Sequence, residues 1–256
     1  MTRRSATAVA LTLLAIALAA GCGRRAHETT VVAHRLVSVT QTDAVDVFDR
    51  PVPTATDTVR LWLGPGLARR DNHDGSLLVD MHRQLLTMVR PADRSYVQGT
   101  SAEISRQLAA LAADPERSDD RQVRRLKSLL QVSARVTDTG KVADIDGYRC
   151  RRWIVEQRFG EQTTLAEVWL TGDLDVDFSL LQRTTQPALA ALPGGEAALA
   201  ELAKLRGVPV LTSSVLTVLG RETRTETRLV ATGLDTVPVS FFAPPPGFRD
   251  RAANSQ

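Results

Sequence analysis

The sequence predicts an α+β fold: a curved antiparallel β-sheet with a few helices inserted into it. Short apolar stretches joined by tight turns dominate the chain, and they indicate strands that pair with their neighbours as an antiparallel meander. In the middle of the chain the apolar period lengthens from two residues to 3.6, which indicates helices. The last third returns to strand patterns.

Residues 1–21 have the organisation of a lipoprotein signal peptide. Arg3 and Arg4 precede an uncharged apolar run at residues 6–20, which is short for a membrane-spanning helix. The sequence LAAGC at residues 18–22 then resembles a bacterial lipobox, so we expect cleavage before Cys22 and lipidation of its thiol. The alternative is an ordinary secretory signal cleaved near Gly21, with Cys22 an incidental thiol.

A lipid on Cys22 would leave Cys150 as the one remaining cysteine, so we expect no disulfide. Cys150 lies in a predicted strand, where a small buried apolar role is expected. We expect residues 22–29 to form a lipidated tether, residues 30–249 one domain, and residues 250–256 a disordered tail. The acyl chains would hold this domain on a membrane, and no further span is expected.

The charge balance argues against nucleic acid as a partner. The chain has 32 Lys and Arg and 29 Asp and Glu, and removal of Arg3 and Arg4 with the signal peptide leaves a net charge of +1. The sequence contains no basic stripe with interleaved aromatic residues, which nucleic-acid binding would require.

The N-terminal half predicts several strands and then two helices. The strands are expected at residues 30–39, 57–63, 76–81, 84–90, 95–98 and 133–138. Thr100 and Glu103 have the spacing of a capping box, in which each side chain accepts from the other residue's backbone amide. Apolar stripes at residues 104–111 and 123–130 indicate the two helices.

One long hairpin is predicted at residues 141–171, and the rest of the chain is arranged around it. Asp146-Gly147 marks its first turn, residues 148–156 and 163–170 form its strands, and both strands are apolar on both faces. Such strands are usually covered on both faces, so we expect this hairpin in the middle of the sheet. Further helices are expected at residues 178–186 and 196–206, and strands at 208–219, 222–231 and 237–242.

Four segments resemble the LolA/LolB and LppX-type lipoprotein carriers, and more closely a related bacterial domain family of unknown function. These segments are residues 76–98, 147–153, 167–177 and 237–248, and they contain strand pairs, a turn and a closing strand. The resemblance implies an incomplete barrel wrapped around helices, with an apolar cavity that the carriers use for acyl chains. It implies no catalytic residue.

The candidate lining of such a cavity is large and apolar, as ligand pockets usually are. It consists of Trp62, Met81, Met88, Trp153 and Trp169. The alternative is that these residues form plain core, because Trp on strands usually packs in a core or an interface.

Two polar clusters are weak candidates for metal or acid–base sites. Residues 173–177, DLDVD, have the alternating carboxylates of a calcium loop but lack its later Gly and Glu, so we interpret them as a turn that caps the following helix. His73 and His82 have no third well-placed ligand. The sequence also lacks the common catalytic motifs, so we expect no enzyme, no cofactor and no metal.

The leading functional hypothesis is therefore a non-catalytic envelope lipoprotein that binds a lipid or acyl chain between sheet and helices. The alternative is a protein-interaction module with a filled core and an envelope protein as its partner. Gly23, in place of Asp after the lipidated cysteine, implies by the lipoprotein sorting rule an outer-membrane location facing the periplasm in a cell with two membranes.

Overall fold

The computed structural model of the chain describes residues 28–47, 50–100, 102–103, 131–160, 162–185, 189, 192–218 and 221–251. Its strands are β1 (Thr30–Thr42), β2 (Val45–Val47), β3 (Arg50–Val52), β4 (Ala55–Gly64), β5 (Leu67–Asn72), β6 (Gly75–Asp80), β7 (Leu85–Arg90), β8 (Ser95–Gly99), β9 (Val132–Ile145), β10 (Tyr148–Phe159), β11 (Gln162–Thr171), β12 (Val208–Val218), β13 (Arg221–Pro238) and β14 (Arg249–Asp250). The helices are α4 (Phe178–Thr185), α5 (Gly195–Leu202) and the 3-10 turns η1 (Pro91–Asp93) and η4 (Val239–Phe242).

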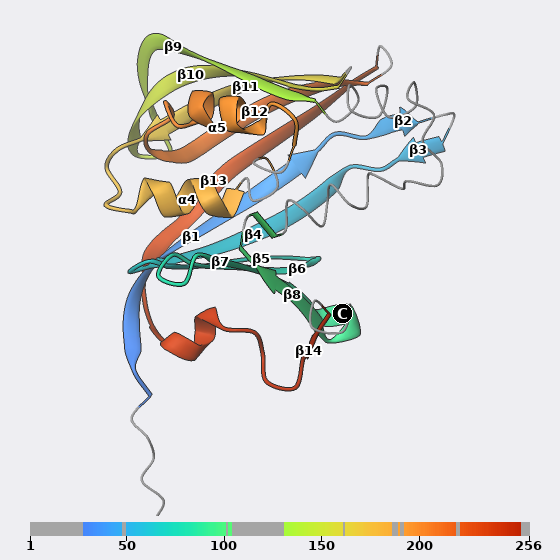
Figure 1. The fold of residues 1–256 in the computed structure, drawn as a ribbon. Helices are drawn as coiled ribbons and strands as arrows, with labels where there is room; N and C mark the ends of the chain where they lie inside the picture. Colours follow the sequence, from blue (N-terminus) through green and yellow to red (C-terminus); the bar gives the residue numbers. More distant parts are fainter. Residues whose placement is uncertain are drawn as a thin grey trace, which may run out of the picture.

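Twelve of these strands form one open sheet (Figure 1). The strand order is β14-β8-β7-β6-β5-β4-β1-β13-β12-β11-β10-β9, and β2 pairs with β3 in a separate small ribbon. Most neighbours in the sheet are consecutive in sequence, as a meander requires. The long strands β1 and β13 pair in the centre and join the two meanders.

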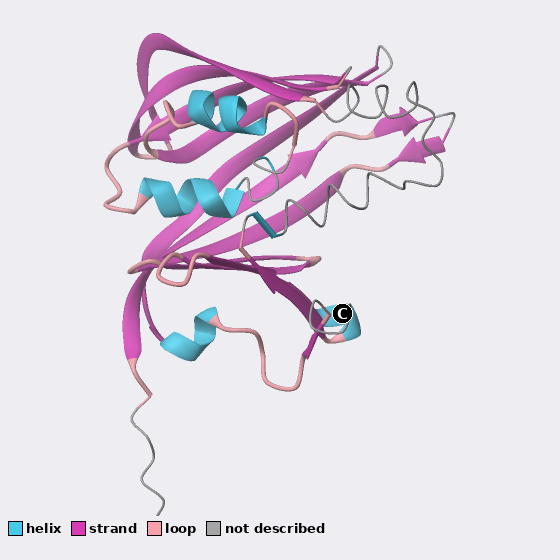
Figure 2. Cartoon of the chain, viewed as in Figure 1, coloured by secondary structure: helices cyan, strands magenta, loops and turns pink. Residues whose placement is uncertain are grey.

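The predicted fold class was wrong. The described structure is mostly β, with 63% strand and 14% helix, and its sheet is open and mixed instead of an antiparallel incomplete barrel (Figure 2). The sheet is mixed because the chain after Pro244–Pro246 returns to the edge of the sheet and pairs β14 in parallel with β8. Only α4 and α5 are α-helices of any length in the described residues, and the predicted helices at 104–111 and 123–130 lie outside them.

The predicted positions of individual elements agree with the structure better than the predicted fold class does. The hairpin of β10 and β11, the helices α4 and α5 and the strands β6 to β8 all lie at the residues where the sequence predicts them. The hairpin does not lie in the middle of the sheet, however, because β10 is the neighbour of the edge strand β9. The capping box is confirmed, since the Thr100 amide donates to Glu103 Oε2 at 2.7 Å and the Glu103 amide donates to Thr100 Oγ1 at 3.2 Å.

Two local predictions failed at the surface that the C-terminal segment covers. β5 was missed because its sequence, LARRDN, is mostly charged and polar. The strand predicted at 237–242 is the end of β13 followed by the turn η4. Both errors have one cause. η4 packs on β5, and the sequence of neither segment reveals this long-range contact.

The main core lies between α4 and the sheet. Leu180 and Leu181 of α4 belong to one cluster of buried residues with side chains from strands at both ends of the sheet, among them Ala68 of β5, Val79 of β6 and Val210 of β12. A second cluster packs α5 on the other end of the sheet, where Leu202 joins Val155, Val168 and Leu170.

The edge strand β9 is partly closed by the segment that leads into α5. The Val132 amide donates to the Pro193 carbonyl at 2.8 Å, and the Val136 amide donates to Glu201 Oε2 at 3.2 Å. Gly194 permits the approach, because a Cβ there would lie 2.3 Å from the Val132 carbonyl oxygen. These bonds protect part of the edge from pairing with another strand.

Candidate functional site

The candidate cavity residues of β4 and β7 lie on opposite faces of the sheet. Strand register aligns Trp62 with Arg69, and it aligns Met88 with Leu77, Arg70 and Leu61. Because successive residues of a strand alternate between faces, Trp62 and its neighbour Leu61 point to opposite sides. Trp62 and Met88 therefore do not line one cavity.

The same separation holds for the two tryptophans of the central hairpin. Trp153 pairs with Val168, and Trp169 pairs with Arg152. Trp153 packs with the cluster under α5, so Trp169 faces away from that helix. The expectation that both faces of the hairpin are covered holds for the α5 face. On the other face Trp169 packs against the main core cluster, whereas Leu165, nearer the β10–β11 turn, is 52% exposed.

The space between α4 and the sheet is filled by aliphatic side chains. Leu180 has no exposed surface and Leu181 is 7% exposed, and both pack among leucines and valines of the sheet. Met81 contacts the edge of this cluster and is itself half-buried. This arrangement fits plain core, the alternative that the sequence left open for these residues.

Trp62 belongs to a separate aromatic cluster with the C-terminal segment. Its indole Nε1 donates to Asp235 Oδ2 at 2.9 Å, and its ring meets Phe241 edge-on at 5.1 Å between centroids. The guanidinium of Arg69 lies 4.4 Å from the centre of the Phe241 ring and donates to the Phe241 carbonyl at 3.0 Å. The charged strand β5 is held in this way by a residue more than 170 positions away.

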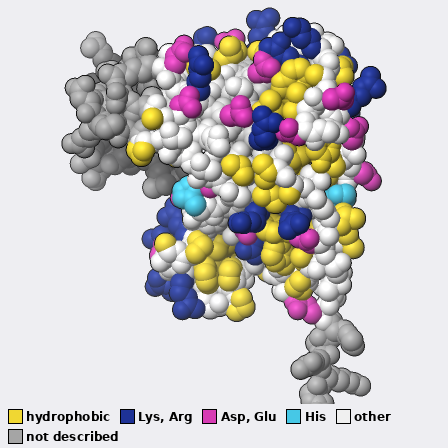
Figure 3. All heavy atoms as spheres, turned by 180° about the vertical axis from the view of Figure 1, so that it is seen from behind, with side chains coloured by type: hydrophobic (Ala, Val, Ile, Leu, Met, Phe, Trp, Pro, Cys, Tyr) yellow, Lys and Arg dark blue, Asp and Glu magenta, His cyan; other side chains and the backbone are white. Residues whose placement is uncertain are grey.

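A different surface, on β10 to β12, combines apolar side chains with exposure. We call it the Trp169 face. Strand register places its members on the side opposite α5: Ile154, Leu165, Trp169, Leu211 and Val215. Leu165 is 52% exposed and the others are half-buried. The view from behind shows hydrophobic side chains gathered between charged ones on the side away from the helices (Figure 3).

Charged groups hold Trp169 in a fixed orientation. Glu167 Oε1 accepts from the indole Nε1 at 2.8 Å, and Glu167 Oε2 accepts from the Arg152 guanidinium. The Arg152 bond holds the pKa of the Glu167 carboxyl below its usual range, against the opposing effect of burial. The Nε atom of Arg152 is buried and has no hydrogen-bond partner.

Arg228 borders the Trp169 face on the β13 side. It pairs in register with Leu211 and forms ion pairs with Asp146 at 2.6 Å and with Glu226 at 3.3 Å. Fixed ion pairs around an apolar centre match the rim and core of a protein interface.

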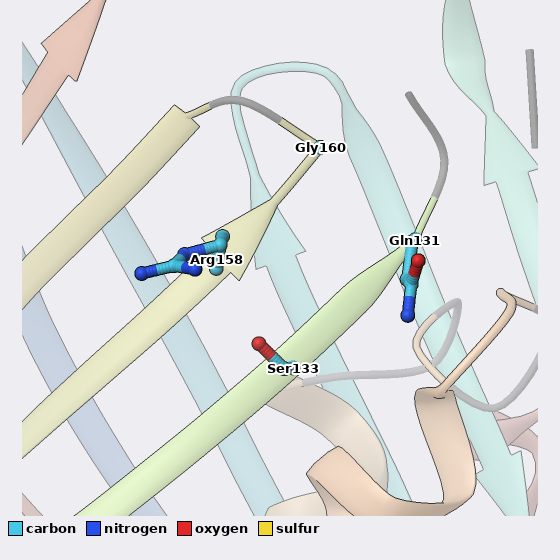
Figure 4. A pocket seen from close by; sticks show the side chains of 4 residues that line it. All are labelled: Gln131, Ser133, Arg158 and Gly160. Carbon is cyan, nitrogen blue, oxygen red and sulfur yellow. The ribbon is translucent and has the colours of Figure 1, made fainter. Parts of the chain in front are cut away.

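A small pocket of about 210 Å³ opens where β9 meets the turn between β10 and β11 (Figure 4). It is lined by Gln131, Ser133, Arg158 and Gly160. The Gly160 amide donates to the Gln131 carbonyl at 2.8 Å, which holds the two segments together. Its lining is polar, so it does not suit an acyl chain.

The two histidines do not share a site. His73 contacts Asp57 at 3.2 Å and Asp74 at 3.0 Å, and His82 contacts the Pro65 carbonyl at 3.2 Å. The described residues contain no group of three or more His, Cys, Asp or Glu side chains that could hold a metal ion.

The acidic segment at residues 173–177 caps α4, in agreement with the turn that the sequence predicts there. Asp177 Oδ1 accepts from the backbone amides of Ser179 at 2.9 Å and Leu180 at 3.2 Å. Asp173 accepts from the Arg149 amide at 3.2 Å and so ties the segment to β10.

Cys150 is fully buried in the main core. Burial raises the pKa of its thiol, and the nearby carboxylate of Asp173 adds to the rise, so the reactive thiolate is disfavoured. Cys22 lies outside the described residues. No helix in the described part of the chain is long and apolar enough to cross a membrane.

Comparison with known proteins gives no relative. No family model matches the sequence, and no curated protein matches it either. The resemblance to the lipoprotein carriers therefore stays a prediction.

The sequence predicted Trp169 as a cavity residue but did not predict the surface around it. The signal lay in the alternation within β11, where Leu165, Glu167 and Trp169 share one face. The contributions of β12 depend on strand pairing, which the sequence alone does not give.

Proposed function

We propose that this chain is a non-catalytic, lipid-anchored module of the bacterial cell envelope that binds a protein partner through the Trp169 face. The observation that carries the proposal is an apolar surface that begins at Trp169, which packs against the main core, and extends to Leu165, which is 52% exposed. Trp and Arg are the side chains most enriched at the energetic centres of interfaces, and here Trp169 and Arg152 lie side by side.

The chemistry of the face defines the kind of partner that it fits. An apolar side chain of the partner would cover Leu165 and the edge of the Trp169 ring. Polar groups at its rim would face the ion pairs of Arg152 with Glu167 and of Arg228 with Asp146. Because Glu167 already fixes the indole, less side-chain freedom is lost on binding.

A filled core makes binding of an acyl chain the weaker candidate. A ligand between α4 and the sheet would have to displace Leu180, which has no exposed surface. Anchoring at Cys22, facing the periplasm from the outer membrane in a cell with two membranes, rests on the signal-peptide pattern and on Gly23.

Site-specific photo-crosslinking in the envelope tests the proposal. A photoreactive residue at Leu165 is expected to capture one defined protein, and the same residue at Val142, which is equally exposed at 52% but lies on β9, is expected to capture none. Leu165→Glu is expected to reduce recovery of that protein at least about tenfold, because it places a charge in the apolar centre. Val142→Glu is the matched control.

Crosslinks that scatter over unrelated proteins from both positions would overturn the protein-binding proposal. Native mass spectrometry of residues 23–256, purified without detergent, is expected to give the mass of the protein alone. A discrete lipid mass that survives washing would instead favour the apolar-ligand hypothesis.

A further inference from the structure

The start of β1 lies within a short reach of the proposed lipid anchor. Glu28, where the described chain begins, lies six positions after Cys22. An extended chain spans at most about 3.4 Å per residue, so Glu28 lies within roughly 20 Å of the lipidated residue. Whatever surface surrounds the start of β1 is therefore held close to the bilayer.

Three of the exposed apolar side chains in the described structure lie at this end. Leu234 is 63% exposed, Val32 is 55% exposed and Val239 is 37% exposed. Val32 pairs with Thr236, and Leu234 pairs with His34, so Val32 and Leu234 are diagonal neighbours on one face of the β1–β13 ribbon.

Val239 lies at the same end of the ribbon, in η4, whose Phe241 packs on Trp62 on the face of the sheet opposite Val32 and Leu234. The Val239 amide donates to the Thr29 carbonyl at 2.8 Å, which places η4 next to the first residues of β1. Ser240 bonds the carboxylate of Glu28. The start of β1 and the red turn of η4 lie at the same end of the molecule (Figure 1). We call Val32 and Leu234 the anchor-end patch.

We infer that the anchor-end patch rests on the bilayer that holds the acyl chains. The inference rests on the proposed lipidation of Cys22 and is independent of any partner at the Trp169 face. Tethering keeps the patch at a high local concentration of lipid, so even weak contact of two aliphatic side chains is sustained. Burial of these side chains in the headgroup and acyl boundary would give the domain one orientation on the membrane.

Accessibility of a spin label in the anchored protein tests the inference. The full-length lipoprotein is placed in vesicles of phosphatidylethanolamine and phosphatidylglycerol, with a nitroxide on Leu234→Cys in one sample and on Leu165→Cys in the other. Cys150 has no exposed surface, so the introduced thiol takes the label. The collision ratio of oxygen to a water-soluble nickel chelate measures contact with lipid.

The label at position 234 is expected to show an oxygen-to-nickel ratio at least about three times that at position 165, because oxygen concentrates in the acyl region and the chelate is excluded from it. Equal, water-like ratios at both positions in protein that floats with the vesicles would overturn the inference and leave the anchor intact. Protein that fails to float would overturn the anchor and the inference together.

Discussion

The strands β4 to β6 and the strands β10 to β12 differ in what covers them, although both segments carry apolar side chains on both faces. At β4 to β6, α4 covers one face and η4 covers the other, where Phe241 packs on Trp62 and Arg69. At β10 to β12, α5 covers one face, whereas on the Trp169 face Trp169 packs against the main core and Leu165 is left 52% exposed. A two-faced apolar strand therefore has two explanations, a buried layer or an interaction surface, and long-range packing decides between them.

The largest loss of stability is expected from a substitution in η4, which covers one face of β4 to β6. Phe242 is 7% exposed and meets Phe241 edge-on at 5.4 Å, so Phe242→Ala should destabilise the fold by about 4 kcal/mol. Urea denaturation followed by circular dichroism measures the change. Phe159→Ala is the control, because Phe159 is 41% exposed. A loss below about 1 kcal/mol for Phe242→Ala would remove the contrast between the two regions.

The next largest loss of stability is expected from a substitution in α4, which covers the other face of β4 to β6. Leu180→Ala should cost about 3 kcal/mol, because it opens a cavity in the main core around a side chain with no exposed surface. Leu165→Ala on the Trp169 face should cost less than about 1 kcal/mol. Similar losses for the two variants would mean that the Trp169 face is packed as a core, and the interaction surface would be refuted.

A smaller effect is expected from the cap that starts α4. Asp177→Ala removes the acceptor for two backbone amides and should cost about 1 kcal/mol. Asp175→Ala is the matched control, since Asp175 is exposed and precedes the cap by two residues. A thermal melt of both variants measures the difference, and equal melting temperatures would show that the cap does not hold α4 on the sheet.

The smallest effect is a pH dependence on the Trp169 face. The pKa of Glu167 is lowered in the folded state, chiefly by its bond from Arg152, so its contribution to stability is present above the usual pKa of 4.5 and is lost as the pH falls through the lowered value. Glu167→Gln should therefore flatten the decline in unfolding free energy below about pH 4.5.

Glu156→Gln on the same face is the control for this titration. Glu156 and Arg158 form an exposed ion pair at 3.6 Å, which should contribute little at any pH. Parallel pH profiles for Glu167→Gln and the unchanged protein would argue that Glu167 does not fix Trp169 through its charge.

Much of the local structure followed from the sequence. The hairpin of β10 and β11, the helix that follows Asp177 and the box of Thr100 with Glu103 depend on turns, apolar period and caps, which act over a few residues. The signal-peptide pattern at residues 1–21 is local in the same sense, and lipidation of Cys22 stays a prediction.

The remaining features of the fold depend on contacts between segments that are distant in the chain. The charged strand β5 exists because Arg69 packs on Phe241, and the sheet is mixed because β14 returns to β8. The alternation within β11 placed Trp169 and Val168 on opposite faces, but only the docking of α5 determined which of those faces lies under that helix. Alternation is a property of the backbone and can be predicted from a short stretch of sequence, whereas burial depends on segments that are distant in the chain and follows only from the folded structure.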